Sequence, residues 1–256
     1  MTTTPLVSRA DKDGVTTLTL DSPHNRNALS ARLVAELTDE VTRASQDLDV
    51  RAVLLTHTGT TFCAGIDLDE ARHPDHAPAA GARRILQLLC TIVESPKPVV
   101  ARVAGHARAG GIGLLGACDI VAAGPQASFA FTEVLLGLAP AVLATTVLPR
   151  LDPRAASRYL LTGERFDAAE AARIGLVTLA PEDGLDTALA PVLDGLRSAA
   201  PNALAATKRL TTAEVRRFFD RDADALTDLA SRLLATDEAR EGIASFLERR
   251  RPVWAS

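Results

Sequence analysis

Three short apolar runs in the first half of the chain constrain its fold more than any other feature. Residues 51–56, 98–103 and 119–123 are each apolar along most of their length rather than at alternate positions. Such runs are typical of strands that are buried on both faces of a parallel sheet. Parallel neighbours must be joined by a crossover, which is usually a helix.

Segments with helical periodicity lie between these runs. Ser30 is placed as an N-cap before a first amphipathic segment, and residues 85–93 form a second. The apolar positions of the first segment are Leu33, Val34, Leu37, Val41, Ala44 and Leu48, and those of the second are Ile85, Leu86, Leu89, Ile92 and Val93. With a further short strand predicted over residues 15–20, the order of elements predicts an α/β fold.

The second half of the chain has a helical pattern. Asp167 and Glu170 have the spacing of a capping box, and Pro201 suits the first position of a helix. The C-terminal helices are predicted over residues 202–219, 222–236 and 237–249. This change of pattern predicts an α/β core over residues 1–200 and a helical region over residues 201–256.

Composition excludes several classes of function. The net charge of −4 gives no basic field for nucleic acid or for an anionic membrane, and charged residues interrupt the most apolar stretch, residues 98–124. The odd set Cys63, Cys90 and Cys118 is neither a disulfide framework nor a zinc site. Without a signal-peptide pattern at the start, we expect a cytoplasmic protein.

The pair His73 and His76 is the strongest hint of a metal site. Pro74 blocks the helical i, i+4 geometry that two histidine ligands would use, and no further ligands cluster nearby. We therefore expect a polar loop over residues 73–80 and no metal.

Two glycine-containing segments carry the strongest signal of chemistry. Residues 62–68 follow one strand and its loop, and residues 105–113 follow another strand. Both segments place small residues at a strand-to-helix transition, where unpaired N–H groups point outward and glycine lets a ligand approach the backbone. Two such turns side by side would form an oxyanion hole with two donors.

A dinucleotide-binding loop is the rival interpretation, because Gly111, Gly113 and Gly116 match G-x-G-x-x-G after a strand. This interpretation would make the chain an NAD-linked oxidoreductase. It fails on length, since the next strand begins at residue 119 and a parallel crossover needs about a dozen residues.

The same segments resemble the crotonase superfamily, the enoyl-CoA hydratases and isomerases, over nearly the whole chain. The order and spacing of the matching segments carry the resemblance. They are Arg26-Asn27-Ala28-Leu29, residues 62–68, residues 105–120 ending in Cys118-Asp119-Ile120, residues 129–137, residues 161–163, residues 171–177, residues 201–208 and residues 246–254.

The resemblance implies a crotonase-like fold with a core of ββα-type spiral turns and a helical C-terminal region for trimerisation. The assembly would be a homotrimer or a hexamer, that is, a dimer of trimers. The substrate would be an acyl-CoA thioester, and no cofactor would be needed because coenzyme A is part of the substrate.

The resemblance also implies the reacting residues. The N–H groups of Ile66 and Gly110 would bind the thioester oxygen of an enolate, and Glu133 would be the catalytic acid or base. Hydratases of this family use a second glutamate at a position that is Gly113 here. The single carboxylate suits double-bond isomerisation; slow hydration and decarboxylation remain open, as does a catalytically weak or silent acyl-CoA binder.

The remaining implied residues contact the substrate. Ala64, Asp67 and Leu68 would line the adenine and pantetheine side, and Arg26 and Ala28 belong to the loop that contacts CoA. Gly113 counts among the substrate-binding positions too, and residues 73–93 would shape the acyl pocket.

Overall fold

A five-stranded sheet forms the centre of the molecule in the computed structural model, which describes residues 4–71 and 78–255. Its strands follow the order β1-β2-β3-β5-β7, and every pair is parallel except β1 with β2. The strands are β1 (Val7–Lys12), β2 (Val15–Leu20), β3 (Ala52–His57), β5 (Val99–Val103) and β7 (Ile120–Ala123). The predicted strands over residues 15–20, 51–56, 98–103 and 119–123 are therefore confirmed.

The continuous apolar runs are explained by burial on both faces of this sheet. Val99 and Ala101 on β5 belong to the large core on one face. Val100, between them, packs with Leu189 of α8 (Leu185–Ser198) on the other face. Because side chains alternate between the faces of a strand, two covered faces require apolar residues at every position.

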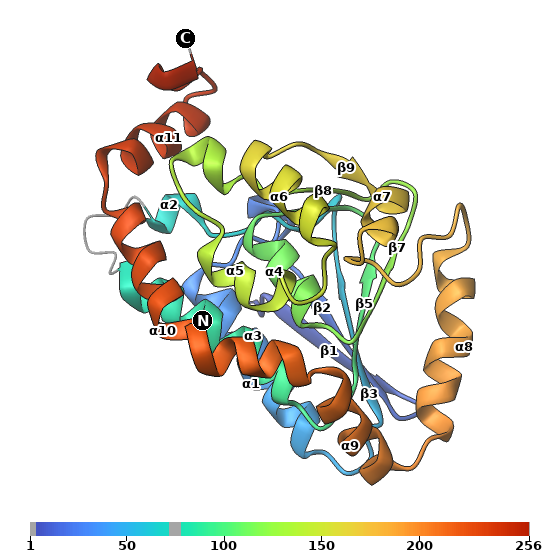
Figure 1. Ribbon diagram of the computed structural model, residues 1–256. Helices are drawn as coiled ribbons and strands as arrows, with labels where there is room; N and C mark the ends of the chain where they lie inside the picture. The colour runs from blue at the N-terminus through green and yellow to red at the C-terminus, as the bar shows by residue number, and fades with distance from the viewer. Residues whose placement is uncertain (1–3, 72–77, 256) are drawn as a thin grey trace.

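A second, smaller sheet was not predicted. Its order is β4-β6-β8-β9, and its strands are β4 (Thr61–Cys63), β6 (His106–Arg108), β8 (Ser128–Ala130) and β9 (Phe166–Asp167). Each of β4, β6 and β8 directly follows a long strand and precedes a helix. The chain thus repeats a unit of long strand, short strand and helix. In Figure 1, β8 and β9 of the smaller sheet lie above β5 of the large sheet.

The helices of the α/β core follow or connect the strands of the two sheets. They are α1 (Ala31–Gln46), α2 (Leu68–Ala71), α3 (Pro78–Glu94), α4 (Gly110–Ala117), α5 (Ala141–Val147), α6 (Pro153–Thr162) and α7 (Ala168–Arg173), with 3-10 turns η1 (Pro23–Asn25) and η2 (Glu133–Leu136). Ser30 caps α1 as predicted, because its Oγ accepts from the N–H of Leu33 at 3.2 Å. Of the predicted loop over residues 73–80, residues 73–77 lie outside the described residues, and α3 already begins at Pro78.

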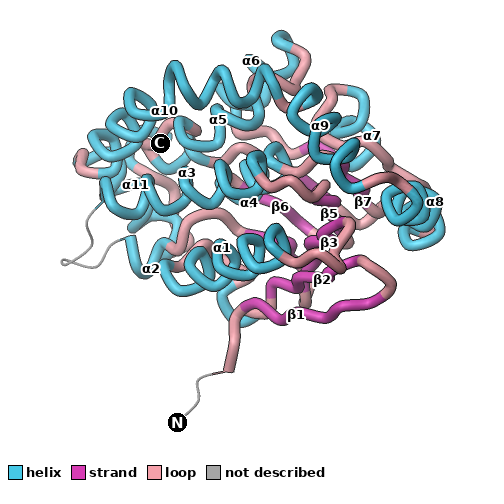
Figure 2. Tube along the Cα trace, turned by 90° about the horizontal axis from the view of Figure 1, so that it is seen from below, coloured by secondary structure: helices cyan, strands magenta, loops and turns pink. Residues whose placement is uncertain are grey.

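The C-terminal region consists of α9 (Pro201–Thr211), α10 (Ala213–Leu234), α11 (Asp237–Leu247) and η3 (Val253–Ala255). The predicted break between residues 219 and 222 is wrong, since α10 runs through it. The chain instead leaves helical geometry at Thr212, whose Oγ1 bonds back to the carbonyl of Lys208. α10 packs along α3 and α5, on the side of the sheet opposite α8 (Figure 2).

The buried Lys208 ties this region to the core. Its Nζ donates to the carbonyls of Ile92 and Lys97 and pairs with Asp119 at 2.8 Å.

The helices described within residues 4–71 and 78–255 include none with the length and hydrophobicity of a membrane span.

Candidate active site

The two glycine-containing segments lie side by side because their short strands are parallel neighbours. β4 pairs with β6, and the chain then enters α2 after β4 and α4 after β6. A Cβ on Gly65 would lie 3.2 Å from the backbone nitrogen of Gly110 and 2.8 Å from the Cβ of Ala109. Gly65 has φ +91°, a conformation that favours glycine. The turn of one segment therefore contacts the turn of the other through glycine backbone.

Some backbone N–H groups of these turns have no hydrogen-bond acceptor within the described residues, and those of Ile66 and Gly110 are among them. Neighbouring groups in the first segment are paired: Ala64 donates to the carbonyl of Arg26, and Leu29 donates to the carbonyl of Gly65. The N–H of Gly110 is also at the start of α4, where the first amides of a helix carry partial positive charge.

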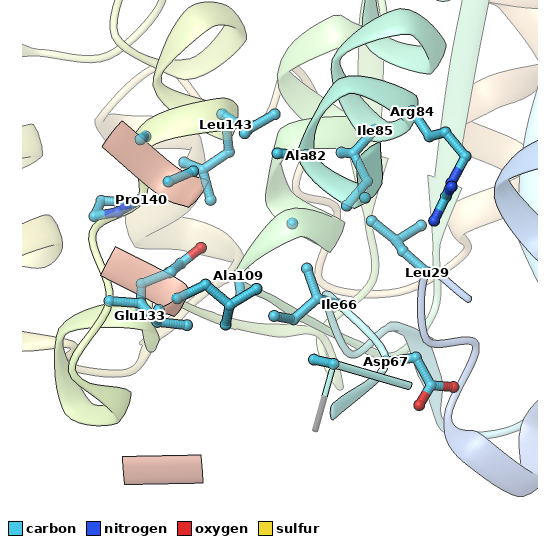
Figure 3. Close-up of a pocket in the computed structure, with 18 of the residues that line it drawn as sticks. Leu29, Ile66, Asp67, Ala82, Arg84, Ile85, Ala109, Glu133, Pro140 and Leu143 are labelled. Carbon is cyan, nitrogen blue, oxygen red and sulfur yellow. The ribbon is translucent and has the colours of Figure 1, made fainter. Parts of the chain in front are cut away.

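An apolar cavity of about 1040 Å³, counting the open solvent at its mouth, lies at these turns. Figure 3 shows Ile66, Ala109 and Glu133 along one edge of it, with Leu143 and Ile85 opposite. The residues that line it are Leu29, Ala31, Val34, Ile66, Asp67, Glu70, Ala71, Gly81, Ala82, Arg84, Ile85, Leu89, Ala109, Gly110, Glu133, Leu136, Leu138, Ala139, Pro140, Ala141, Val142, Leu143, Ala230 and Leu234.

Glu133 contributes a carboxylate with an unusual environment. It is the first residue of η2, which Gly137 ends in a left-handed conformation. Its Oε2 is buried and has no partner within the described part of the chain. Burial raises the pKa of Glu133 to about 7, because the charged form loses its hydration. Such a group exchanges a proton readily near neutral pH.

The position of Gly113 is closed off from this cavity. Gly113 is buried on α4 and does not line the cavity. A Cβ there would lie 2.9 Å from the Cβ of Leu143 on α5 and 3.7 Å from the Cδ1 of Leu89. Thr146 of α5 donates to the carbonyl of Gly113 at 2.9 Å. The space beside Gly113 is therefore filled by α5, with Leu143 at the contact.

The residues expected to contact CoA are only partly brought to the cavity. Asp67 lines it, but its carboxylate caps α2 and accepts from the side chain of Asn25 at 3.0 Å. Ala64 and Leu68 flank the cavity in sequence without lining it, Ala28 is buried, and Arg26 is exposed at the end of η1.

Much of the wall comes from elements that the sequence motifs did not mark. α3 supplies Arg84 and Ile85 from within residues 73–93, and α10 supplies Ala230 and Leu234. The amphipathic pattern of α3 was visible in the sequence, whereas nothing in the pattern of α10 distinguishes a cavity wall from core packing.

Other polar candidates point elsewhere. Arg108 donates to the carbonyl and Oγ of Ser128, and His106 also contacts that Oγ, so neither enters the cavity. Burial raises the pKa of the Cys63 thiol to about 12, which excludes a thiolate nucleophile at neutral pH. The described residues contain no cluster of three or more potential metal ligands.

These features define a class of protein: repeated strand–strand–helix turns that carry an apolar cavity with free backbone N–H groups and one buried carboxylate. The sequence profile of the enoyl-CoA hydratase/isomerase family matches residues 10–256. The chain is 33% identical over 250 residues to the 2,3-dehydroadipyl-CoA hydratase of Escherichia coli K12, covering 96% of each chain. It is also 33% identical over 240 residues to the (E)-benzylidenesuccinyl-CoA hydratase of Thauera aromatica, covering 93% of this chain and 94% of that one.

The fold comparison agrees. The crystal structure of an enoyl-CoA hydratase from Mycobacterium avium superposes with a TM-score of 0.91 at 50% identity, covering 98% of this chain and 100% of that one. The chain belongs to the enoyl-CoA hydratase/isomerase family of the crotonase superfamily. The predicted crotonase-like α/β fold is confirmed, and the protein is an enzyme of acyl-CoA thioesters.

Proposed function

We propose that this enzyme moves a double bond within an enoyl-CoA thioester, with Glu133 as its single acid and base. Glu133 would take a proton from C2 of a 3-enoyl thioester. The electron pair would move into the carbonyl, giving an enolate oxygen held by the N–H groups of Ile66 and Gly110. The same carboxyl group would return the proton to C4, so that no water is consumed.

The two free N–H groups support the enolate step. Each such donor is typically worth about 2.7–4 kcal/mol in the transition state, because the charge on oxygen develops only there. The apolar lining of the cavity strengthens this effect, since water does not compete for the charge.

The observation that carries the choice of reaction is the contact between Gly113 and Leu143. Hydratases that resemble this chain hold water between two glutamates, and the second would stand at Gly113. Here the Cβ of Leu143 would lie 2.9 Å from a Cβ at that position, so α5 leaves no room for a carboxylate. Glu133 can transfer a proton between two carbons alone, but it has no partner with which to fix a water.

The other carboxylates of the cavity are committed elsewhere. Asp67 accepts from the N–H of Asp69 and Glu70, and Glu70 accepts from the N–H of Ala31 at the start of α1. Figure 3 places Asp67 away from Leu143, and Glu70 is held at the start of α1, so neither replaces the missing glutamate.

The test compares two thioesters with the same enzyme. Hex-3-enoyl-CoA should be converted to the 2-enoyl isomer faster than hex-2-enoyl-CoA is hydrated. Glu133→Gln should lower kcat/KM by about 10²–10⁴-fold. In the wild type, kcat/KM should rise with pH through about 7, as Glu133 becomes a base. Equal rates in wild type and Glu133→Gln would refute the acid–base role and leave an acyl-CoA binder.

The remaining expectations belong to the same proposal. Arg26, Ala28, Ala64, Asp67 and Leu68 would form the CoA side of the site. The C-terminal region would mediate a trimer or hexamer, which is supported by its exposed apolar residues, Phe246, Val253 and Trp254. Sedimentation velocity of the purified chain tests the assembly, and a monomer would contradict it.

A further inference from the structure

Ala109 has a backbone conformation that is rarely adopted by residues with a side chain. Its φ is +49° and its ψ is −125°, in a region that favours glycine. Its backbone is held there from both sides: its N–H donates to the carbonyl of Ala130 at 3.1 Å, and its carbonyl accepts from Ile112 at 2.8 Å. The direction of the Ala109 methyl group is therefore fixed by its surroundings.

This methyl group stands in the cavity between the proposed reacting groups. Ala109 immediately precedes Gly110 and lines the cavity. Figure 3 places it between Ile66 on one side and Glu133 on the other. Its Cβ lies so near the first turn that a Cβ on Gly65 would be only 2.8 Å away. A glycine would relieve the backbone conformation, but it would remove this methyl group from the cavity.

The Ala109 methyl group lies beside the expected position of one carbon of a bound thioester. If the thioester oxygen lies on the N–H groups of Ile66 and Gly110, C1 is held there. C2 is bonded to C1 and must also come within reach of Glu133. It therefore lies between the donors and the carboxylate, where the Ala109 methyl group faces it.

We propose that the Ala109 methyl group restricts this site to acyl-CoA thioesters that carry no branch at C2. The inference rests on the proposed placement of the thioester, but not on which reaction follows. A C2 methyl group would meet the Ala109 methyl group, and the pinned backbone of Ala109 cannot move aside.

The test measures binding, so that it is independent of turnover. Calorimetric Kd values for but-2-enoyl-CoA and 2-methylbut-2-enoyl-CoA are compared in a Glu133→Gln background. The unbranched thioester should bind at least tenfold more tightly. Adding Ala109→Gly should reduce this preference at least fivefold, chiefly by improving the Kd of the branched thioester.

Ala107→Gly is the matched control. Ala107 is a fully buried alanine on β6, two positions earlier, and does not line the cavity. It should leave the ratio of Kd values within twofold of the parent. Ala107→Gly should lower Tm, whereas Ala109→Gly should lower it less or raise it, because glycine relieves the backbone at position 109 only.

The outcomes separate the two proposals. Unchanged discrimination in Ala109→Gly, or an equal change in Ala107→Gly, would overturn the role of Ala109 while leaving the acyl-CoA site intact. Failure of both thioesters to bind would overturn the proposed placement of the substrate and this inference with it.

Discussion

The two sides of the cavity are built in different ways. On the donor side, the proposed reacting groups are the backbone N–H groups of Ile66 and Gly110, and Gly65 lies close to the nitrogen of Gly110. On the acid–base side, the proposed chemistry depends on single side chains, the carboxylate of Glu133 and the alkyl group of Leu143.

This difference explains how one fold can support several reactions. A backbone donor is retained whenever the turn is retained, since almost any side chain can follow it. A carboxylate can be removed by one substitution, and beside Gly113 the space is filled by α5. Enolate stabilisation is therefore the more durable property, and the fate of the enolate is the more variable one.

The donor side should be broken most severely by Gly65→Ala. The new Cβ would clash with Ala109 and press on the nitrogen of Gly110, while φ +91° opposes any side chain. Displacing one oxyanion donor typically lowers kcat about 10²–10³-fold. Steady-state kinetics on the preferred thioester measures this loss.

Gly195→Ala is the control for Gly65→Ala. Gly195 lies within α8, and a Cβ there would meet nothing within 4 Å. Alanine is the better helix former, so this variant should keep its kcat and gain up to about 1 kcal/mol of stability. A similar loss of kcat in both variants would contradict the assignment of the donor turn.

The acid–base side can be probed through the pH dependence of stability. The pKa of Glu133 is raised from 4.5 to about 7 in the folded protein, so folding favours the protonated form. Wild-type stability should therefore be highest below about pH 4.5 and fall until the pH passes 7. Relative to Glu133→Gln, which has no charge to bury, the wild type should lose up to about 3 kcal/mol by pH 8.

Urea unfolding of wild type and Glu133→Gln from pH 5 to pH 8 measures this difference. The gap between the variant and the wild type should widen with pH and level off above pH 7. A gap that stays constant across the range would mean that Glu133 is hydrated in the folded protein, and that its pKa does not prepare it for catalysis.

The sequence predicted four of the five strands of the large sheet, and helices such as α1 and α3, because their signals are local. The runs at residues 51–56, 98–103 and 119–123 are long enough to show that both faces are buried. Strands such as β4 and β6 are too short to show any periodicity, so the second sheet was not foreseen. The hairpin of β1 and β2 was missed too, although Asp13-Gly14, both with positive φ, is a common hairpin turn.

In the candidate site, too, the features with local signals were predicted and those that depend on tertiary packing were not. Glycines at two strand ends indicated the donor turns, because a close approach of two backbones requires glycine and glycine is visible in the sequence. No sequence pattern predicted the contact between Leu143 and Gly113, since it depends on how α5 packs against α4. The share of α10 in the cavity wall likewise arises from tertiary packing.

The packing beside Gly113 can be tested with a double-mutant cycle. Gly113→Ala should cost about 1–3 kcal/mol of stability, because its Cβ would overlap the Cβ of Leu143. Leu143→Gly, which also removes the contacting Cβ, should alone cost about 3–6 kcal/mol, both as a cavity mutation and as a glycine within a helix. The two costs should be far from additive if the side chains compete for one space.

Chemical denaturation of the two single variants and the double variant measures the coupling. Additivity within about 0.5 kcal/mol would mean that α4 and α5 move apart freely, and that a carboxylate at position 113 could be accommodated. The absence of a second glutamate would then be a matter of sequence alone, and Gly113→Glu should gain hydratase activity.

The smallest expected effect comes from Thr146→Val, which keeps the shape of the side chain and removes one hydrogen bond to the carbonyl of Gly113. Since that carbonyl lies within α4, the loss should be about 1 kcal/mol. Thr145→Val is the matched control, because the Oγ1 of Thr145 donates only within α5, to the carbonyl of Val142.

The kinetics of both variants test whether α5 acts only by filling space. If it does, Thr146→Val and Thr145→Val should both keep kcat/KM within about threefold of the wild type, a difference below 1 kcal/mol in the barrier. A selective loss of kcat in Thr146→Val would instead mean that the register of α5 on α4 positions the reacting groups, and that the acid–base side is not a matter of single side chains.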